Sequence, residues 1–227
     1  MNSRSTAALL LQVVSWALPW GLRRHVLVRV LGFDIAHGAS IGFSLVSARS
    51  VRLGPFSRIG HLTLVRNLDT LELGEHAIIG NLNKIAGVLP ASSGPFADQP
   101  DRVAALVVDD HAAITNSHLI DCTDRVEIGS FATLAGWGTQ ILTHSIDFKT
   151  NRQRSGPVRI GRYSFVGTRC VVLKGAVLPE RSVLAAGSVL ASHEAESFTL
   201  YSGVPAISAK RLDPESLYFS RTVGPVA

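Results

Sequence analysis

Cysteine and aromatic residues are scarce in this sequence, and no apolar run is long. Two cysteines among 227 residues, Cys122 and Cys170, cannot supply the several bridges of a disulfide-rich fold. Cys170 occupies a small-residue position of the repeat described below, and we interpret it as a reduced side chain of the core. No other residues have the spacing of a metal site, and we predict no metal. The apolar run Ala7–Leu18 is shorter than the roughly 20 residues that a membrane-spanning helix needs.

Acidic residues are also in the minority, with 17 Asp and Glu against 22 Lys and Arg. The resulting net charge of +5 favours an anionic partner. The positive charges are scattered and are not interleaved with aromatic residues, which argues against nucleic-acid binding. A phosphate-bearing co-substrate or an anionic membrane surface would use the same charge.

A six-residue repeat is the strongest positive signal. Every sixth position from Ile160 to Leu190 is aliphatic. The position four after each of the first five is small: Ser164, Cys170, Ala176, Ser182 and Ser188. An amphipathic helix repeats every 3.6 residues and a half-buried strand every 2, so neither explains this interval. A hexapeptide β-helix does, because its chain turns a corner every six residues and fills its interior with the aliphatic side chains. We therefore predict an all-β protein built as a parallel β-helix.

The same register can be followed toward the amino terminus. It begins at Ile35, places Ser47 and later Gln140 at interior positions, and is interrupted at 81–105 and 141–157. Glycine follows the aliphatic residue at Gly161 and Gly167, as expected where a corner forces tight or left-handed backbone. We predict a helical segment over 1–34, the β-helix over 35–192 with loops at the two interruptions, and a tail over 193–227.

The segment before the β-helix has its own character. Two mostly apolar stretches flank Pro19 within residues 5–31, and they predict two short helices that pack on the end of the β-helix or on a neighbouring subunit. The sharper alternative is peripheral membrane contact through Trp16, Leu18, Trp20 and the arginines. We expect a cytoplasmic protein, at the inner face of the membrane if this segment touches lipid.

His144 lies where a regular coil gives way to the second interruption. Interruptions of a solenoid form loops that often carry function. A neutral imidazole can accept a proton near pH 7, so His144 is a candidate general base, although a lone histidine is often only a surface side chain. We interpret His118 as a histidine on the coil surface.

Several motifs around His144 resemble one family. Thr143-His144-Ser145-Ile146-Asp147, Phe165-Val166-Gly167, Leu184-Ala185-Ala186-Gly187 and Gly203-Val204-Pro205-Ala206 are similar to the carboxy-terminal signature of hexapeptide-repeat acyltransferases, in particular sugar and polysaccharide O-acetyltransferases. The resemblance implies a left-handed β-helix and a homotrimer. It also implies acetyl-CoA in the cleft between adjacent prisms and a loop histidine, here His144, as the base.

The resemblance also implies further site residues. Family members often place an Asn or Asp near the acceptor or the histidine; Asn116 and Asp121 lie in the corresponding region, and we assign the role to Asn116. Asp147 is a candidate to orient His144. The residues that match the pantetheine-lining positions are Gly167, Thr168 and Ala186. Phe165 and Ile207 stand where the family usually has Trp and a basic residue, so Lys210 is the candidate contact for the 3′-phosphate.

The leading hypothesis is a CoA-dependent O-acetyltransferase that acts on a sugar in surface polysaccharide or glycan biosynthesis. A non-catalytic β-helix scaffold is the second hypothesis, because a fold alone does not establish a function. An N-acyltransferase acting on an amino sugar is the third. The oxyanion of the tetrahedral intermediate would need a donor, for which we consider a backbone N–H of the turn 134–138.

Overall fold

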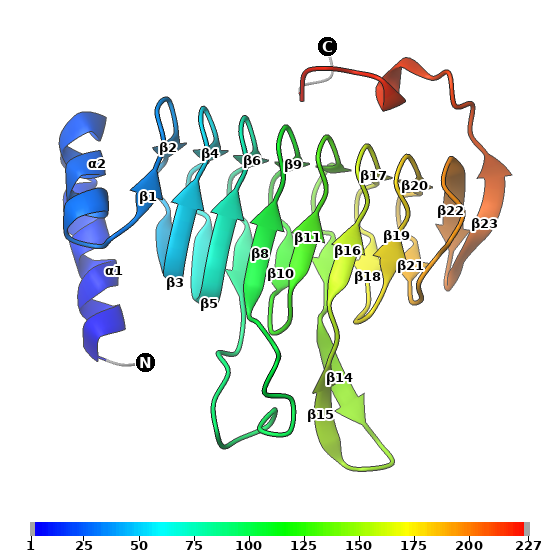
Figure 1. The fold of residues 1–227 in the computed structure, drawn as a ribbon, viewed down its shortest axis with the longest axis horizontal. Helices are drawn as coiled ribbons and strands as arrows, with labels where there is room; N and C mark the ends of the chain where they lie inside the picture. Colours follow the sequence, from blue (N-terminus) through cyan, green and yellow to red (C-terminus); the bar gives the residue numbers. More distant parts are fainter. Residues whose placement is uncertain (1–2, 225–227) are drawn as a thin grey trace.

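The computed structural model describes residues 3–224 and shows a three-sided β-helix with two helices at its amino-terminal end (Figure 1). Short strands stack coil upon coil, and each regular coil gives one strand to each of three faces. Within the described residues only two strand pairs are antiparallel, β14 with β15 and β22 with β23. The predicted left-handed parallel β-helix with short helices before it is confirmed.

Each face is a stack of parallel strands in the order of the coils. Face 1 contains β2 (Ser40–Ile41), β4 (Arg58–Ile59), β6 (Ile78–Ile79), β9 (Ala113–Ile114), β12 (Thr133–Leu134), β17 (Phe165–Val166), β20 (Val183–Leu184), β22 (Thr199–Gly203) and β23 (Ala206–Arg211). Face 2 contains the first parts of β3 (Leu45–Leu53) and β5 (Leu64–Leu73), then β7 (Lys84–Ala86), β10 (Leu119–Asp121), β13 (Gln140–Ile141), β18 (Val171–Val172) and β21 (Val189–Leu190).

Face 3 contains β1 (Asp34–Ile35), the later parts of β3 and β5, β8 (Ala105–Val108), β11 (Val126–Ile128), β16 (Val158–Ile160) and β19 (Val177–Leu178). Faces 2 and 3 join in one sheet because β5 bends around the edge, pairing with β7 by its first part and with β8 by its later part. We call the edge between faces 1 and 2 the first corner, that between faces 2 and 3 the second corner, and that between faces 3 and 1 the third corner.

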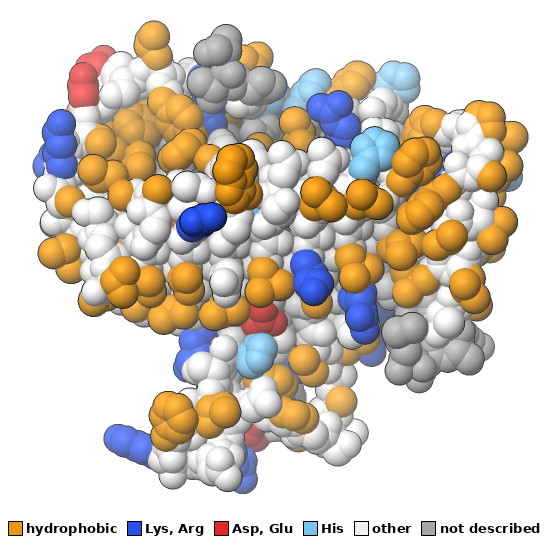
Figure 2. Space-filling model, turned by 180° about the vertical axis from the view of Figure 1, so that it is seen from behind, with side chains coloured by type: hydrophobic (Ala, Val, Ile, Leu, Met, Phe, Trp, Pro, Cys, Tyr) orange, Lys and Arg blue, Asp and Glu red, His pale blue; other side chains and the backbone are white. Residues whose placement is uncertain are grey.

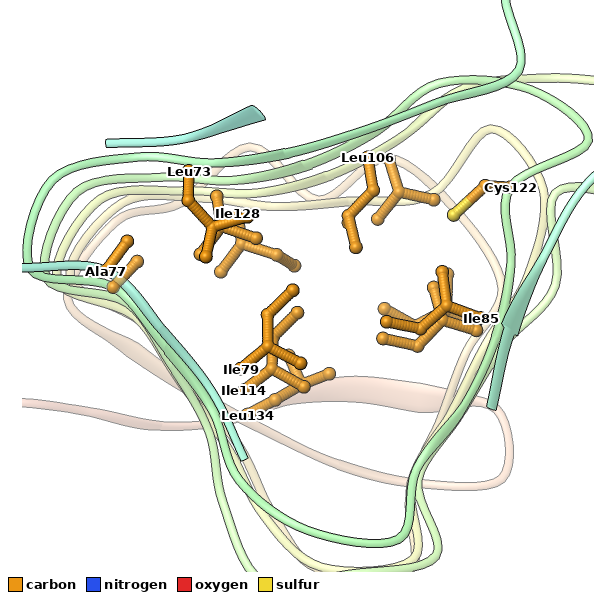
Figure 3. Packing of buried hydrophobic residues seen from close by; sticks show 14 of the residues in the cluster. Leu73, Ala77, Ile79, Ile85, Leu106, Ile114, Cys122, Ile128 and Leu134 are labelled. Atoms are coloured by element: carbon orange, nitrogen blue, oxygen red, sulfur yellow. The ribbon is translucent and has the colours of Figure 1, made fainter. Parts of the chain in front are cut away.

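The interior is a column of aliphatic side chains. Ile160, Val166 and Val172 are fully buried, as the hexads predict, and the five small residues of the repeat, from Ser164 to Ser188, are buried too. Figure 3 looks along the prism and shows Ile79, Ile114 and Leu134 stacked above one another on one side of the triangular interior. Removing these side chains from water on every coil is the main source of stability.

The register differs from the hexads at two turns of the first corner. Val46 rather than Ser47 is buried, because the first turn from Ile41 to face 2 is one residue shorter than a hexad. Ile141 rather than Gln140 is buried, because the turn 135–139 is one residue longer. Gly136 and Gly138 provide the positive φ angles of that longer turn.

The corner glycines have a different role from the one predicted. Gly161 and Gly167 do not have positive φ; the left-handed residues are Tyr163 and Arg169, two positions later. A Cβ on Gly161 would lie 2.4 Å from the backbone nitrogen of Glu180 on the next coil. The glycine is needed because successive coils approach closely at this position.

Helices α1 (Ser3–Ser15) and α2 (Trp20–Arg29) cover the first coil. The Gln12 side-chain amide donates to the carbonyl of Val46 at 2.8 Å and accepts from its N–H at 2.9 Å, as a neighbouring strand would. Arg23 donates to the carbonyls of Ile41 and Gly42. These bonds satisfy an edge that would otherwise pair with another chain. Within residues 3–224, neither helix has the length and apolar character to cross a membrane.

The carboxy-terminal boundary also differs from the sequence prediction. Strand β22 pairs in parallel with β20, so regular sheet continues beyond residue 192. After β23 the chain runs back along the prism (Figure 1), with a short 3-10 helix, η1 (Leu217–Phe219). There Arg221 donates to the carbonyl of Phe131 and lies 4.0 Å from the ring centroid of Tyr218.

Candidate active site

Both long interruptions leave the prism at the second corner (Figure 1). The first, predicted over 81–105, spans 87–104, because β7 is still part of a coil. The second spans 142–157 and forms a hairpin of β14 (His144–Asp147) and β15 (Arg152–Ser155). Strand β10 lies between β7 and β13 on face 2. Its last residue, Asp121, therefore reaches the second corner between the two interruptions. Stacked strands lie about 4.8 Å apart, which brings residues from three coils into one small region.

His144 and Asp121 meet at this corner. The Nδ1 atom of His144 lies 2.6 Å from Oδ2 of Asp121, within the range of a charge-assisted hydrogen bond. The imidazole is 37% exposed and the carboxylate 15% exposed. His144 therefore has one ring edge held by a sheltered carboxylate and remains accessible from solvent.

Asp121 is held in its ionised form by its surroundings. Burial opposes ionisation, but hydrogen bonds from Thr123 and His144 outweigh it and lower the pKa of Asp121 below its ordinary value. The same carboxylate accepts from the Thr143 N–H at 2.8 Å and from the Thr143 hydroxyl at 2.9 Å. An ionised carboxylate can only accept, so Nδ1 of His144 carries the proton in this pair. In the neutral form of the ring, Nε2 is then the nitrogen without a proton and can take one from a bound molecule.

The first interruption supplies a wall beside the imidazole. The ring of Phe96 meets His144 edge-on, with centroids 5.8 Å apart and an interplanar angle of 88°. The guanidinium of the buried Arg102 also lies over the Phe96 ring, 4.6 Å from its centroid. Arg102 also donates to the carbonyls of Val88 and Thr123, which ties the base of the loop to the Asp121 turn.

The two interruptions are joined by polar bonds. Asp98 accepts from Arg152 at 3.0 Å and from Arg154 at 2.5 Å. The side-chain amide of Gln99 accepts from the N–H of Ser155 at 3.0 Å and donates to its carbonyl at 3.3 Å. Ser155 is the hairpin partner of His144. The loop and the hairpin thus fix each other, and with them the position of the imidazole.

The structure places Asp147 and Asn116 away from the imidazole of the same chain. Asp147 closes the far end of the hairpin, where it accepts from the Lys149 N–H at 3.0 Å and the Thr150 hydroxyl at 2.7 Å. Asn116 lies at the first corner and accepts from the N–H of Asn81 at 2.7 Å. The partner of His144 in this chain is Asp121, which our assignment passed over; a contribution of Asn116 to an acceptor site stays a prediction.

The predicted CoA-lining residues also lie at the first corner. Gly167 and Ala186 are stacked on successive coils, and a Cβ on Gly167 would lie 2.6 Å from the Ala186 nitrogen. The carbonyl of Thr168 accepts from the N–H of Gly187, and its hydroxyl donates to the carbonyl of Trp137. Lys210 lies farther along, on the exposed antiparallel strand β23. Face 2 separates this group from His144 by five to six residues, roughly 15–20 Å at about 3.3 Å per residue.

The turn 134–138 lies on the same corner. The N–H groups of Ala135 and Gly138 donate to backbone carbonyls, and that of Trp137 donates to the Thr168 hydroxyl. Within residues 3–224, no group of three or more His, Cys, Asp or Glu side chains is arranged to hold a metal ion.

His118 is buried, contrary to the sequence interpretation. It is 2% exposed, and its Nε2 lies 3.0 Å from the Thr115 hydroxyl while its Nδ1 accepts from the Thr139 N–H at 3.2 Å. Burial lowers the pKa of His118 to about 4. Its ring joins two turns of the first corner and is not open to substrate.

Solved structures of similar fold were found, whereas no protein-family model and no curated protein matches the chain. A variant of AntD, an N-acyltransferase from Bacillus cereus, in complex with dTDP-4-amino-4,6-dideoxyglucose and coenzyme A, is 14% identical with a TM-score of 0.52, over 82% of this chain and 88% of that one. The polysialic acid O-acetyltransferase OatWY is 16% identical with a TM-score of 0.52, over 84% and 90%. These likenesses establish that the chain has the fold of hexapeptide-repeat acyltransferases.

Proposed function

We propose that this protein is an acyltransferase that moves an acetyl group from acetyl-CoA to a sugar acceptor, with His144 as the general base. The observation that carries the proposal is the 2.6 Å contact between His144 and the sheltered carboxylate of Asp121. An imidazole oriented in this way is what a weak nucleophile such as a sugar hydroxyl requires.

The proposed reaction needs one proton carrier. Nε2 of His144 takes the proton of the acceptor hydroxyl as its oxygen attacks the thioester carbonyl, and the imidazolium is stabilised by Asp121. The tetrahedral intermediate then collapses, the carbon–sulfur bond breaks, and the imidazolium returns the proton to the leaving thiolate of CoA. In the turn 134–138 the N–H groups of Ala135, Trp137 and Gly138 already donate to partners, so the N–H of Gly136 would stabilise the oxyanion.

We propose that the complete site lies between two copies of the chain in a homotrimer. His144 and the candidate CoA-lining residues lie at opposite edges of face 2, so one prism does not bring them together. Most outward side chains of face 2 are apolar, namely Leu45, Leu64, Leu119, Val171 and Val189, and the exceptions are Lys84 and Gln140. Most of those on face 3 are charged and form ion pairs: Asp34, Arg52, Glu72, Glu127 and Arg159. Of these two faces, face 2 is the better suited to a partner copy.

A hydroxyl acceptor needs the His144–Asp121 pair more than an amine does. A hydroxyl must lose its proton as it attacks the thioester, whereas a neutral amine can attack before it loses a proton. AntD, an N-acyltransferase, supports the amino-sugar alternative. Asp98 already pairs with Arg152 and Arg154, so these arginines carry no argument for an anionic acceptor.

The direct test is to measure CoA release and acetylated product over a panel of sugars that offer either hydroxyl or amino groups. We expect acetyl-CoA-dependent transfer to a hydroxyl sugar, at a rate above that for its amino counterpart. Transfer only to amino sugars would establish the alternative. A folded protein that neither binds CoA nor acetylates any member of the panel would contradict the proposal and favour a scaffold.

A further inference from the structure

Helix α1 buries polar side chains and exposes apolar ones, the reverse of an ordinary surface helix. Gln12 and Ser15 face the prism and are each 1% exposed, whereas Leu10 is 61% and Val14 is 71% exposed. A surface helix normally buries its apolar stripe and presents its polar side chains to water. In α1 the polar side chains are buried against the prism instead, because Gln12 forms hydrogen bonds with the backbone of Val46 at the edge of the first coil.

The exposed apolar residues form a stripe along α1. On α1 and the turn after it, the solvent-facing apolar residues recur at helical spacing: Leu10, Val13, Val14, Ala17 and Leu18. Leu22 on α2 and Val30, directly after α2, are further exposed apolar residues of this end. Figure 2 shows hydrophobic side chains gathered at this end of the molecule, with no acidic side chain among them in that view.

Basic side chains predominate near this surface. The sequence has no Asp or Glu before Asp34, and Asp34 pairs with Arg52. Arg29 is exposed in the last turn of α2, directly before Val30, and His25 is exposed one turn earlier. Apolar residues next to a cation, with no free carboxylate among them, are typical of helices that lie in the interface of an anionic bilayer.

We propose that the stripe Leu10–Leu18, with Leu22 of α2 and the adjoining Val30, docks this end of the protein on a membrane surface that carries anionic lipid headgroups. A second copy of the chain fits less well. In a two-fold contact through this end, the exposed Arg29 would face a segment with no carboxylate to pair with it. Anionic headgroups supply the missing counter-charge. The proposal does not depend on the catalytic assignment of His144.

The test is flotation of the full-length protein with vesicles of phosphatidylcholine alone or mixed with phosphatidylglycerol. We expect binding to the anionic vesicles. The Val14→Asp change should weaken it about tenfold or more, because it places a charge in the apolar stripe. Arg29→Glu should weaken binding to anionic vesicles by about fivefold or more, from the loss of one favourable cation. Leu217→Asp is the matched control, because Leu217 is 85% exposed at the opposite end of the chain.

Val14 projects into solvent, so Val14→Asp should fold normally, and circular dichroism checks this. Acetyl transfer to a soluble acceptor should also be unchanged in this variant, which separates the membrane surface from the reaction. Three outcomes would overturn the proposal: no vesicle binding by the folded protein, equal binding to neutral and anionic vesicles, or equal binding by Val14→Asp. A change in solution mass on Val14→Asp without vesicle binding would identify the stripe as an interface between copies.

Discussion

His118 and His144 lie on adjacent coils, yet their surroundings are opposite. His118 is enclosed at the first corner and bonds to a threonine hydroxyl and a backbone N–H. His144 stands half-exposed at the second corner against the carboxylate of Asp121. The same side chain is a neutral structural link in one position and a candidate base in the other. The difference comes from solvent access and from the charge of the partner, which together decide whether an imidazole can gain a proton during turnover.

The largest change in activity should come from replacing Asp121, the carboxylate partner that His144 has and His118 lacks. We expect Asp121→Asn to lower kcat by about 10²–10⁴-fold, because an amide can donate to Nδ1 and leave the proton on Nε2. The KM for acetyl-CoA should change little. Asp147→Asn is the matched comparison, because Asp147 lies on the hairpin that carries His144 but does not contact its ring. Steady-state kinetics of both variants check the assignment. Equal losses in the two would remove the distinction between Asp121 and Asp147.

The second prediction is that His118 makes the stability of the fold depend on pH. Its pKa is lowered from 6.5 to about 4. The unfolded chain therefore binds more protons than the folded one between these values, and stability falls as the pH falls through this window. The free energy of unfolding should decrease by about 3 kcal/mol from pH 7 to pH 4 on this account. Urea denaturation over this range measures it, and a His118→Gln variant should lose less over the same interval. An equal loss in the variant would assign the pH dependence to other groups.

A smaller effect should follow from removing the wall beside His144. We expect Phe96→Ala to lower kcat/KM about tenfold, because the imidazole loses the ring that limits its orientation. Phe148→Ala is the control, since Phe148 is 90% exposed at the hairpin tip. The folded state of both variants can be compared by thermal melting. If Phe96→Ala kept full activity, the loop 87–104 would have no part in positioning His144.

The hexads predicted the fold because each one reports a local requirement, an aliphatic side chain that faces the interior at every turn. They failed at Ser47 and Gln140, where a corner is one residue short or long, since the period cannot reveal the length of an individual turn. The buried position of His118 was missed for a related reason. Its neighbours Thr115 and Thr139 come together only when two turns stack.

The pairing of Asp121 with His144 was beyond the sequence pattern. The two residues are brought together because β10 and β13 pair with Ile120 beside Ile141, a 21-residue offset that includes a long corner. Asp147 is nearer in sequence, but the hairpin carries it to the far end. Phe96 and Arg102 had no sequence signal, because the loop that holds them carries no repeat.

The most direct test is kcat for His144→Ala at saturating acetyl-CoA, measured beside His193→Ala, an exposed histidine at the start of face 3 that pairs with Val177. His144 lies in a hairpin and adds little to the interior, so the folded state and CoA binding should be retained. If His144 is the general base, kcat should decrease by about 10²–10⁴-fold for His144→Ala. The kcat of His193→Ala should stay close to that of the unaltered protein. Near-normal acetyl transfer by His144→Ala would contradict the assignment of the general base.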